Sequence, residues 1–82
     1  MATMTDEAEA KLQDVVRAAL DLPADVDVTG VRQSGVATWD SLAHVSLMLA
    51  IEGEFAVAID VADQIQLMSY PAIRRYLEER GV

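Results

Sequence analysis

The chain has 82 residues, 52% of them hydrophobic, and its 14 acidic against 6 basic side chains give a net charge of −8. This length accommodates one domain, expected over residues 1–82, and is too short for a large enclosed active site. The hydrophobic content argues against disorder, and the excess of acidic side chains argues against nucleic-acid binding. The absence of cysteine excludes disulfides, thiolate metal sites and a cysteine nucleophile.

The N-terminal segment lacks the features of a targeting signal. Residues 1–10 contain Asp6, Glu7 and Glu9 and have neither a basic nor an apolar signal region, and no apolar run is long enough to span a bilayer. We therefore expect a cytoplasmic monomer without a membrane partner.

A first helix is predicted from Thr5 to Leu20. Its apolar residues recur at the three-and-four spacing of one helical face: Ala8, Leu12, Val15, Val16, Ala19 and Leu20. Thr5 is placed to cap the start, and Glu7 and Lys11 are expected to pair four residues apart. The helix should end before Pro23.

A long connection follows, over residues 21–38. It contains Pro23, Gly30 and Gly35, and its irregular pattern suits neither a helix nor a strong strand. Its valines are expected to pin it to a helical core: Val26, Val28, Val31 and Val36.

The second helix is predicted from Ser41 to about Glu54, with Asp40 as its cap. It is apolar on two faces, and the stripe of Leu42, Val45 and Leu49 is assigned to the core. Met48 and Met68 are assigned to the core as well.

The remaining chain predicts an extended connector over 55–59, a short helix over 61–66 and a last helix from Ser69 to about Arg80. Ser69 is the expected cap, and Ile73, Tyr76 and Leu77 should face inward. The expected fold is all-α, a small bundle of three main helices and one short one, with a long loop between the first two.

Three catalytic or metal-binding interpretations fail because each lacks a part that its chemistry needs. Asp25 and Asp27 resemble the start of a calcium loop, but its twelfth position is Val36 where a carboxylate is needed. The same string resembles a phosphatase nucleophile motif that needs a doubly wound sheet. Ser41 and His44 lie on one helix face, yet a hydrolase needs a third group and an oxyanion hole. His44 is therefore interpreted as an exposed surface residue.

The most informative stretch runs from Thr38 to Val45, where the long loop meets the second helix and Ser41 stands between Asp40 and Leu42. The Ser41 hydroxyl should be exposed at a helix start, whose free amides and positive dipole end favour an anion such as a phosphate ester. The alternative is that Asp40 and Ser41 only cap the helix.

Asp40-Ser41-Leu42 resembles the phosphopantetheine attachment motif of the acyl and peptidyl carrier proteins. The likeness covers nearly the whole chain: a first helix, a long loop, the serine opening the second helix, the acidic-aromatic run of residues 52–55, and a last helix opened by a hydroxyl residue. Length, acidity and absence of cysteine also match.

The resemblance implies a small four-helix carrier-protein bundle without catalytic activity. Ser41 would carry 4'-phosphopantetheine, attached from coenzyme A by a phosphopantetheinyl transferase, with Asp40 and Leu42 completing the motif. The arm would hold an acyl, aminoacyl or peptidyl group as a thioester, loaded by a ligase or acyltransferase and passed to synthase, ketosynthase, condensation or tailoring enzymes. The cargo stays open.

The resemblance also names a partner-binding surface. It comprises Trp39, Leu42, Val45, Leu49 and Glu52, with Glu52 meeting basic patches on partner enzymes. Trp39 has two alternatives, packing under the loop or sheltering the root of the arm and selecting partners.

The departures from the family pattern bear on the pathway. Ala43, Ser46 and Gly53 stand at commonly acidic places, which favours a discrete carrier of polyketide or nonribosomal peptide biosynthesis over primary fatty-acid synthesis. The other alternative is a helical interaction domain that is not modified.

Overall fold

Capping side chains set the starts of the three longer helices. The structure is a computed structural model and describes residues 4–82. The Oγ1 atom of Thr5 accepts from the Ala8 amide (3.1 Å), and Ser69 Oγ accepts from the Ala72 amide (3.2 Å). The predicted caps are confirmed, Asp40 included, because capping is a local interaction between residues three apart in the sequence.

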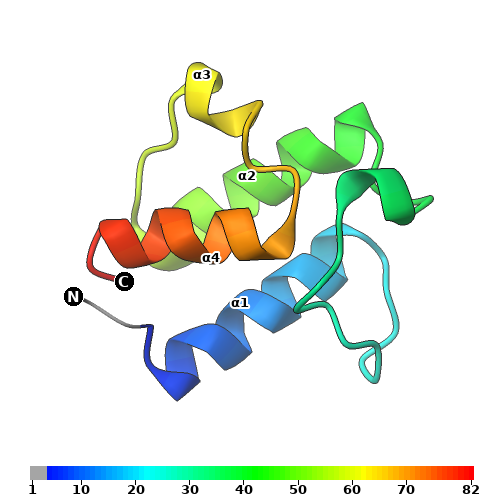
Figure 1. Cartoon of the computed structure of the whole chain (residues 1–82), viewed down its shortest axis with the longest axis horizontal. Helices are drawn as coiled ribbons and strands as arrows, with labels where there is room; N and C mark the ends of the chain where they lie inside the picture. The colour runs from blue at the N-terminus through cyan, green and yellow to red at the C-terminus, as the bar shows by residue number, and fades with distance from the viewer. Residues whose placement is uncertain (1–3) are drawn as a thin grey trace.

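Four α-helices and one short 3-10 helix make up the described chain, in the order α1, η1, α2, α3, α4 (Figure 1). Their bounds are Asp6–Ala19 for α1, Gln33–Gly35 for η1, Ser41–Phe55 for α2, Val61–Gln64 for α3 and Tyr70–Glu79 for α4. No strand forms between residues 4 and 82, where the only pairing of that kind is an isolated bridge between Arg32 and Ser69. The all-α prediction is confirmed. The connector expected over 55–59 runs over residues 56–60, because Phe55 is the last residue of α2.

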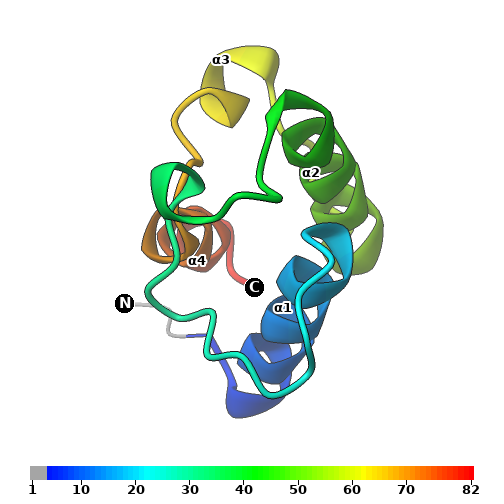
Figure 2. The same ribbon diagram turned by 90° about the vertical axis from the view of Figure 1, so that its right-hand side faces the viewer.

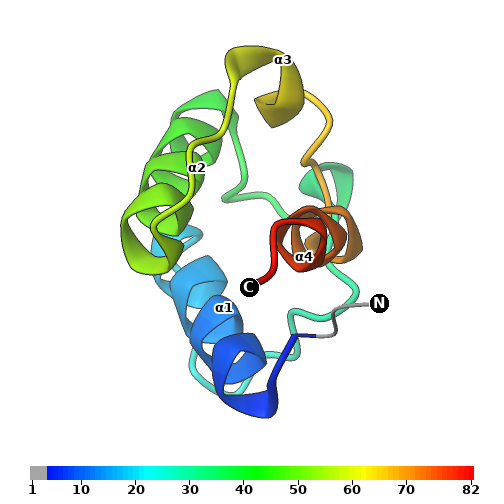
Figure 3. The ribbon, with the colours of Figure 1, turned by 90° about the vertical axis from the view of Figure 1, so that its left-hand side faces the viewer.

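Helices α1 and α2 lie along one side of the molecule, and α4 crosses on the other (Figure 3). The long connector over residues 20–40 passes the N-terminal end of α4 on its way to α2 (Figure 2). Backbone bonds from Gln33 N to Met68 O and from Tyr70 N to Val31 O, both 2.9 Å, fix it there. Val28 is fully buried and the other three valines are partly buried, as predicted.

A single core forms where these helices meet. Its buried apolar residues are Met4, Leu12, Val16, Leu20, Val28, Trp39, Leu47, Met48, Ile51, Ile59, Leu67, Tyr70, Ile73, Tyr76 and Leu77. The prediction for Ile73, Tyr76 and Leu77 is confirmed. The radius of gyration of 11.6 Å is that of a compact chain of this length, for which about 12 Å is expected.

The far end of α2 is held by α1. Lys11 Nζ donates to the Glu54 carbonyl (2.9 Å), pairs with the Glu54 carboxylate (3.4 Å) and lies 5.4 Å from the centre of the Phe55 ring. The predicted pairing of Lys11 with Glu7 is therefore wrong. A lysine beside a helix C-terminus is attracted to the negative end of the helix dipole and can donate to the free carbonyls there.

No helix in residues 4–82 has both the length and the apolar character that crossing a membrane requires.

Candidate functional site

The site centres on the start of α2. Ser41 is the first residue of this helix and is exposed. Asp40 stands before it in extended conformation, and its Oδ1 accepts from the Ala43 amide (2.8 Å) while its carbonyl accepts from the His44 amide (2.9 Å). The amides of Ser41 and Leu42 precede the first helical bond, so they are free to face an anion on the Ser41 oxygen.

An apolar face runs along α2 from this serine. Leu42, Val45 and Leu49 are 77%, 50% and 62% exposed. Their spacing of three and four residues places them on one side of the helix, and Ser41 lies on that side too, four residues before Val45. The assignment of this stripe to the core was wrong. Residues 47, 48 and 51 fill the core instead, and Leu42, Val45 and Leu49 are hereafter the apolar face.

Helix α3 adds apolar side chains that sequence reasoning missed. Val61 is 76% exposed and Ile65, which follows the helix, is 63% exposed. Met68 is 41% exposed, so its assignment to the core was also wrong. The sequence signal for this exposed pair was the spacing of Val61 and Ile65, which lie four residues apart in a segment too short to bury both.

Helix α3 lies beside the first half of α2 (Figures 2 and 3). The Gln64 carbonyl at its end is 2.7 Å from His44 Nε2. Asp63 ties it to α4, accepting from the Tyr76 hydroxyl (3.2 Å) and pairing with Arg80 (3.7 Å). Burial, and then the bond to Asp63, raise the pKa of Tyr76, which therefore keeps its proton as a donor.

The surface of α2 beside Ser41 carries no charge. Residues 41–51 contain no Asp, Glu, Lys or Arg, and the exposed carboxylates nearest in sequence are Asp40 and Glu54. Any partner that covers this face therefore meets an apolar centre with acidic groups at its margin.

His44 is buried, which corrects its interpretation as an exposed surface residue. It is 9% exposed, and both ring nitrogens are engaged: Nδ1 accepts from the Trp39 indole (3.1 Å), and Nε2 bonds to the Gln64 carbonyl. Both partners come from outside α2, so helical periodicity alone did not predict the burial. With both nitrogens in use, His44 is not available to activate Ser41.

Trp39 packs beneath the loop, the first of its two alternatives. Its side chain is 2% exposed and its ring stacks near His44, with centroids 6.1 Å apart. A buried indole presents no surface for direct contact with a partner, so its influence on the site is through the loop before Ser41.

Glu52 has a bond inside the fold. Its Oε2 accepts from the Ile59 amide (2.8 Å), which fastens the connector between α2 and α3. This carboxylate is half-buried and holds the backbone, whereas the resemblance assigned it to partner binding.

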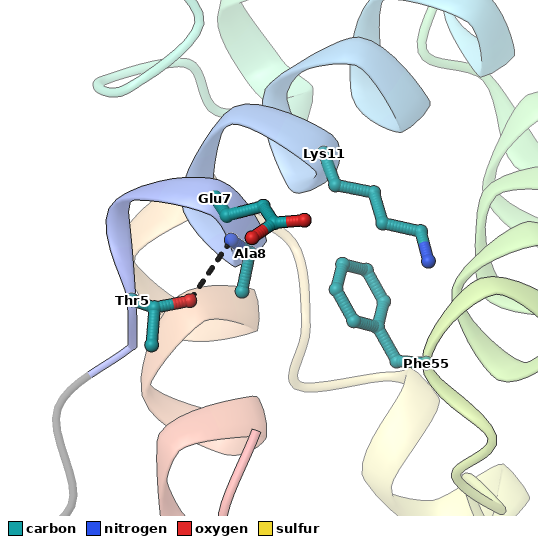
Figure 4. Close-up of a pocket in the computed structure, with 5 residues that line it drawn as sticks. All are labelled: Thr5, Glu7, Ala8, Lys11 and Phe55. Carbon is teal, nitrogen blue, oxygen red and sulfur yellow. Dashed lines mark hydrogen bonds between the residues drawn. The ribbon is translucent and has the colours of Figure 1, made fainter.

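A separate hollow lies at the opposite end of α2. It is lined by Thr5, Glu7, Ala8, Lys11 and Phe55, with the lysine alongside the aromatic ring (Figure 4). Phe55 is 14 residues from Ser41, or about 20 Å along the helix, so this hollow is not part of the Ser41 site. The described residues bring together no cluster of three or more side chains of the types that hold metals.

No family model, curated protein or solved structure matches this chain. Its function is therefore inferred from the residues and geometry described above.

Proposed function

We propose that this protein is a carrier that holds acyl, aminoacyl or peptidyl intermediates as thioesters on a 4'-phosphopantetheine arm attached to Ser41. The observation that carries the proposal is the position of an exposed serine at the capped start of α2, on the same side of the helix as an exposed apolar face. The resemblance of residues 40–42 to the attachment motif of carrier proteins supports the same proposal.

The residues at the start of α2 fit a phosphate ester. The Ser41 hydroxyl is accessible to a transferase, and the helix start favours the negative charge of the phosphate. Asp40 uses one oxygen to cap the helix. When attached, the arm supplies the thiol chemistry, while the chain provides the attachment point and the docking surface.

The apolar face supports the role of the protein in presenting cargo. Leu42, Val45 and Leu49 expose large side chains that do not contribute to the core, and Val61 and Ile65 add to them from α3. Apolar side chains at the centre of an interface supply most of its binding energy, and acids at the rim mainly aid encounter. We expect partner enzymes to complement this face, basic groups meeting the marginal carboxylates.

The uncharged surface favours a discrete carrier of polyketide or nonribosomal peptide biosynthesis over one of primary fatty-acid synthesis. Residues 41–51 of α2 offer no acidic side chain for docking, and the Glu52 carboxylate accepts from the Ile59 amide. Docking that depends on apolar contact should weaken little when salt screens charges.

The proposal is tested by the intact mass after incubation with coenzyme A and a broad-specificity phosphopantetheinyl transferase. The parent should gain one arm, Ser41→Ala should gain none, and Ser46→Ala should behave like the parent because it removes another exposed serine of the same helix. Modification of Ser41→Ala would place the site elsewhere. No gain with several transferases would favour an unmodified interaction domain that uses the same apolar face.

A further inference from the structure

The single histidine of the chain joins three segments. His44 belongs to α2, its Nδ1 partner Trp39 lies in the connector two residues before Ser41, and its Nε2 partner is the carbonyl of Gln64 at the end of α3. The ring is 9% exposed and Trp39 is 2% exposed, so these bonds form in a largely dry environment. A buried donor or acceptor that loses its partner there is costly.

One protonation state satisfies both bonds. A carbonyl oxygen only accepts, so Nε2 carries the hydrogen, and an indole nitrogen only donates, so Nδ1 offers its lone pair. The ring is therefore the neutral tautomer with hydrogen on Nε2. A proton added to Nδ1 places two N–H donors against each other, while the bond from Nε2 to Gln64 is kept.

We propose that His44 is a proton-sensitive latch on the loop that leads into Ser41. In its neutral form it holds Trp39 against α2. A proton taken from solvent by the Nδ1 lone pair releases the indole and loosens residues 36–40, without detaching α3. This proposal does not depend on the carrier function, since it concerns the unmodified chain.

The surrounding charges leave a protonated ring without a counter-ion. Within the described part of the chain, no carboxylate forms an ion pair with His44. The carboxylates on the two segments that bond to the ring have other partners or face solvent. Asp40 caps α2, Asp60 is exposed before α3, and Asp63 bonds to Tyr76 and Arg80.

The chain offers a natural reporter, because it has one tryptophan and one histidine. On 15N-labelled unmodified protein, the Trp39 indole signal should move in a single transition as the pH is lowered from 8, before circular dichroism at 222 nm shows any loss of helix. Over the same range, acrylamide quenching of Trp39 fluorescence should rise, because the indole loses the hydrogen bond that holds it against α2.

Two variants isolate the histidine. In His44→Gln, which does not titrate, both changes should disappear. In Gln64→Ala they should persist, because His44 bonds to the backbone carbonyl of residue 64 and not to its side chain. A transition retained in His44→Gln, or an indole shift without any rise in quenching, would overturn the proposal.

A measurement on the parent alone keeps the test valid if His44→Gln fails to fold. Long-range 1H–15N correlation of the imidazole at pH 8 reports which nitrogen carries the hydrogen. The latch requires hydrogen on Nε2 and an unprotonated Nδ1, and the opposite tautomer would contradict it.

Discussion

Leu47 and Leu49 provide a matched pair that tests the orientation of α2. They are two residues apart on one helix, yet Leu47 is 0% exposed and Leu49 is 62% exposed. Truncating Leu47 to alanine removes a fully buried side chain and leaves a cavity, which costs about 3 to 5 kcal/mol of unfolding free energy. A domain of this length has a total of roughly 4 to 12 kcal/mol, so the variant should lose a large part of its stability.

Truncating Leu49 should have a much smaller effect. Most of its surface is already in water, so little burial is lost and no closed cavity forms, which gives less than about 1 kcal/mol. Alanine also has a favourable helix propensity. Urea unfolding followed by circular dichroism at 222 nm measures both values. Equal costs for the two variants would refute the assignment of Leu49 to an exposed face.

Four further predictions concern local structure. Gly53→Ala should stabilise α2 by about 0.5 to 1 kcal/mol, because Gly53 is helical and an added Cβ meets nothing within 4 Å. Ala56→Gly should also stabilise the helix end, because Ala56 has a φ of 54°. Thermal unfolding measures both, and a lower Tm in either variant would contradict the reasoning. Asp40→Ala should cost about 1 kcal/mol whereas Asp40→Asn retains the cap, again measured by urea unfolding, and equal losses would count against the cap. The hydrogen bonds from the Thr29 hydroxyl and amide lower the pKa of Asp27 below 3.8, so the small stabilisation they give is present at neutral pH and is lost as the pH falls through that lowered pKa. In Thr29→Val, the carboxyl 13C shift of Asp27 should show titration at a higher pH than in the parent. An unchanged midpoint would contradict this prediction.

Helix starts were predictable from the sequence because their determinants are local. Thr5, Asp40 and Ser69 each bond to an amide three residues later, and the required residues are adjacent in the chain. The αL residue that ends α2 was not predicted, since the left-handed conformation falls on Ala56 and not on a glycine.

The inward side of α2 was not predictable in the same way. A helix with apolar residues all round gives no periodic signal for which side meets α1 and α4. Leu47 and Leu49 are chemically identical, and only the packing of the neighbouring helices separates them. Whole-domain packing therefore determined which apolar residues are left at the surface beside Ser41.

The polar contacts that shape the site were also beyond local reasoning. His44 is buried because Trp39 and Gln64 approach it from two other segments, and Glu52 turns to the Ile59 amide across a loop. The position of Ser41 at an exposed helix start was predictable, because its neighbours in the sequence create it.

The intact mass of the protein after treatment with coenzyme A and a phosphopantetheinyl transferase tests the central claim most directly. We predict that the parent gains one phosphopantetheine arm and that Ser41→Ala, folded to the same helicity, gains none. An unchanged mass of the parent with several transferases, or modification that persists in Ser41→Ala, would contradict the assignment of Ser41 as the carrier site.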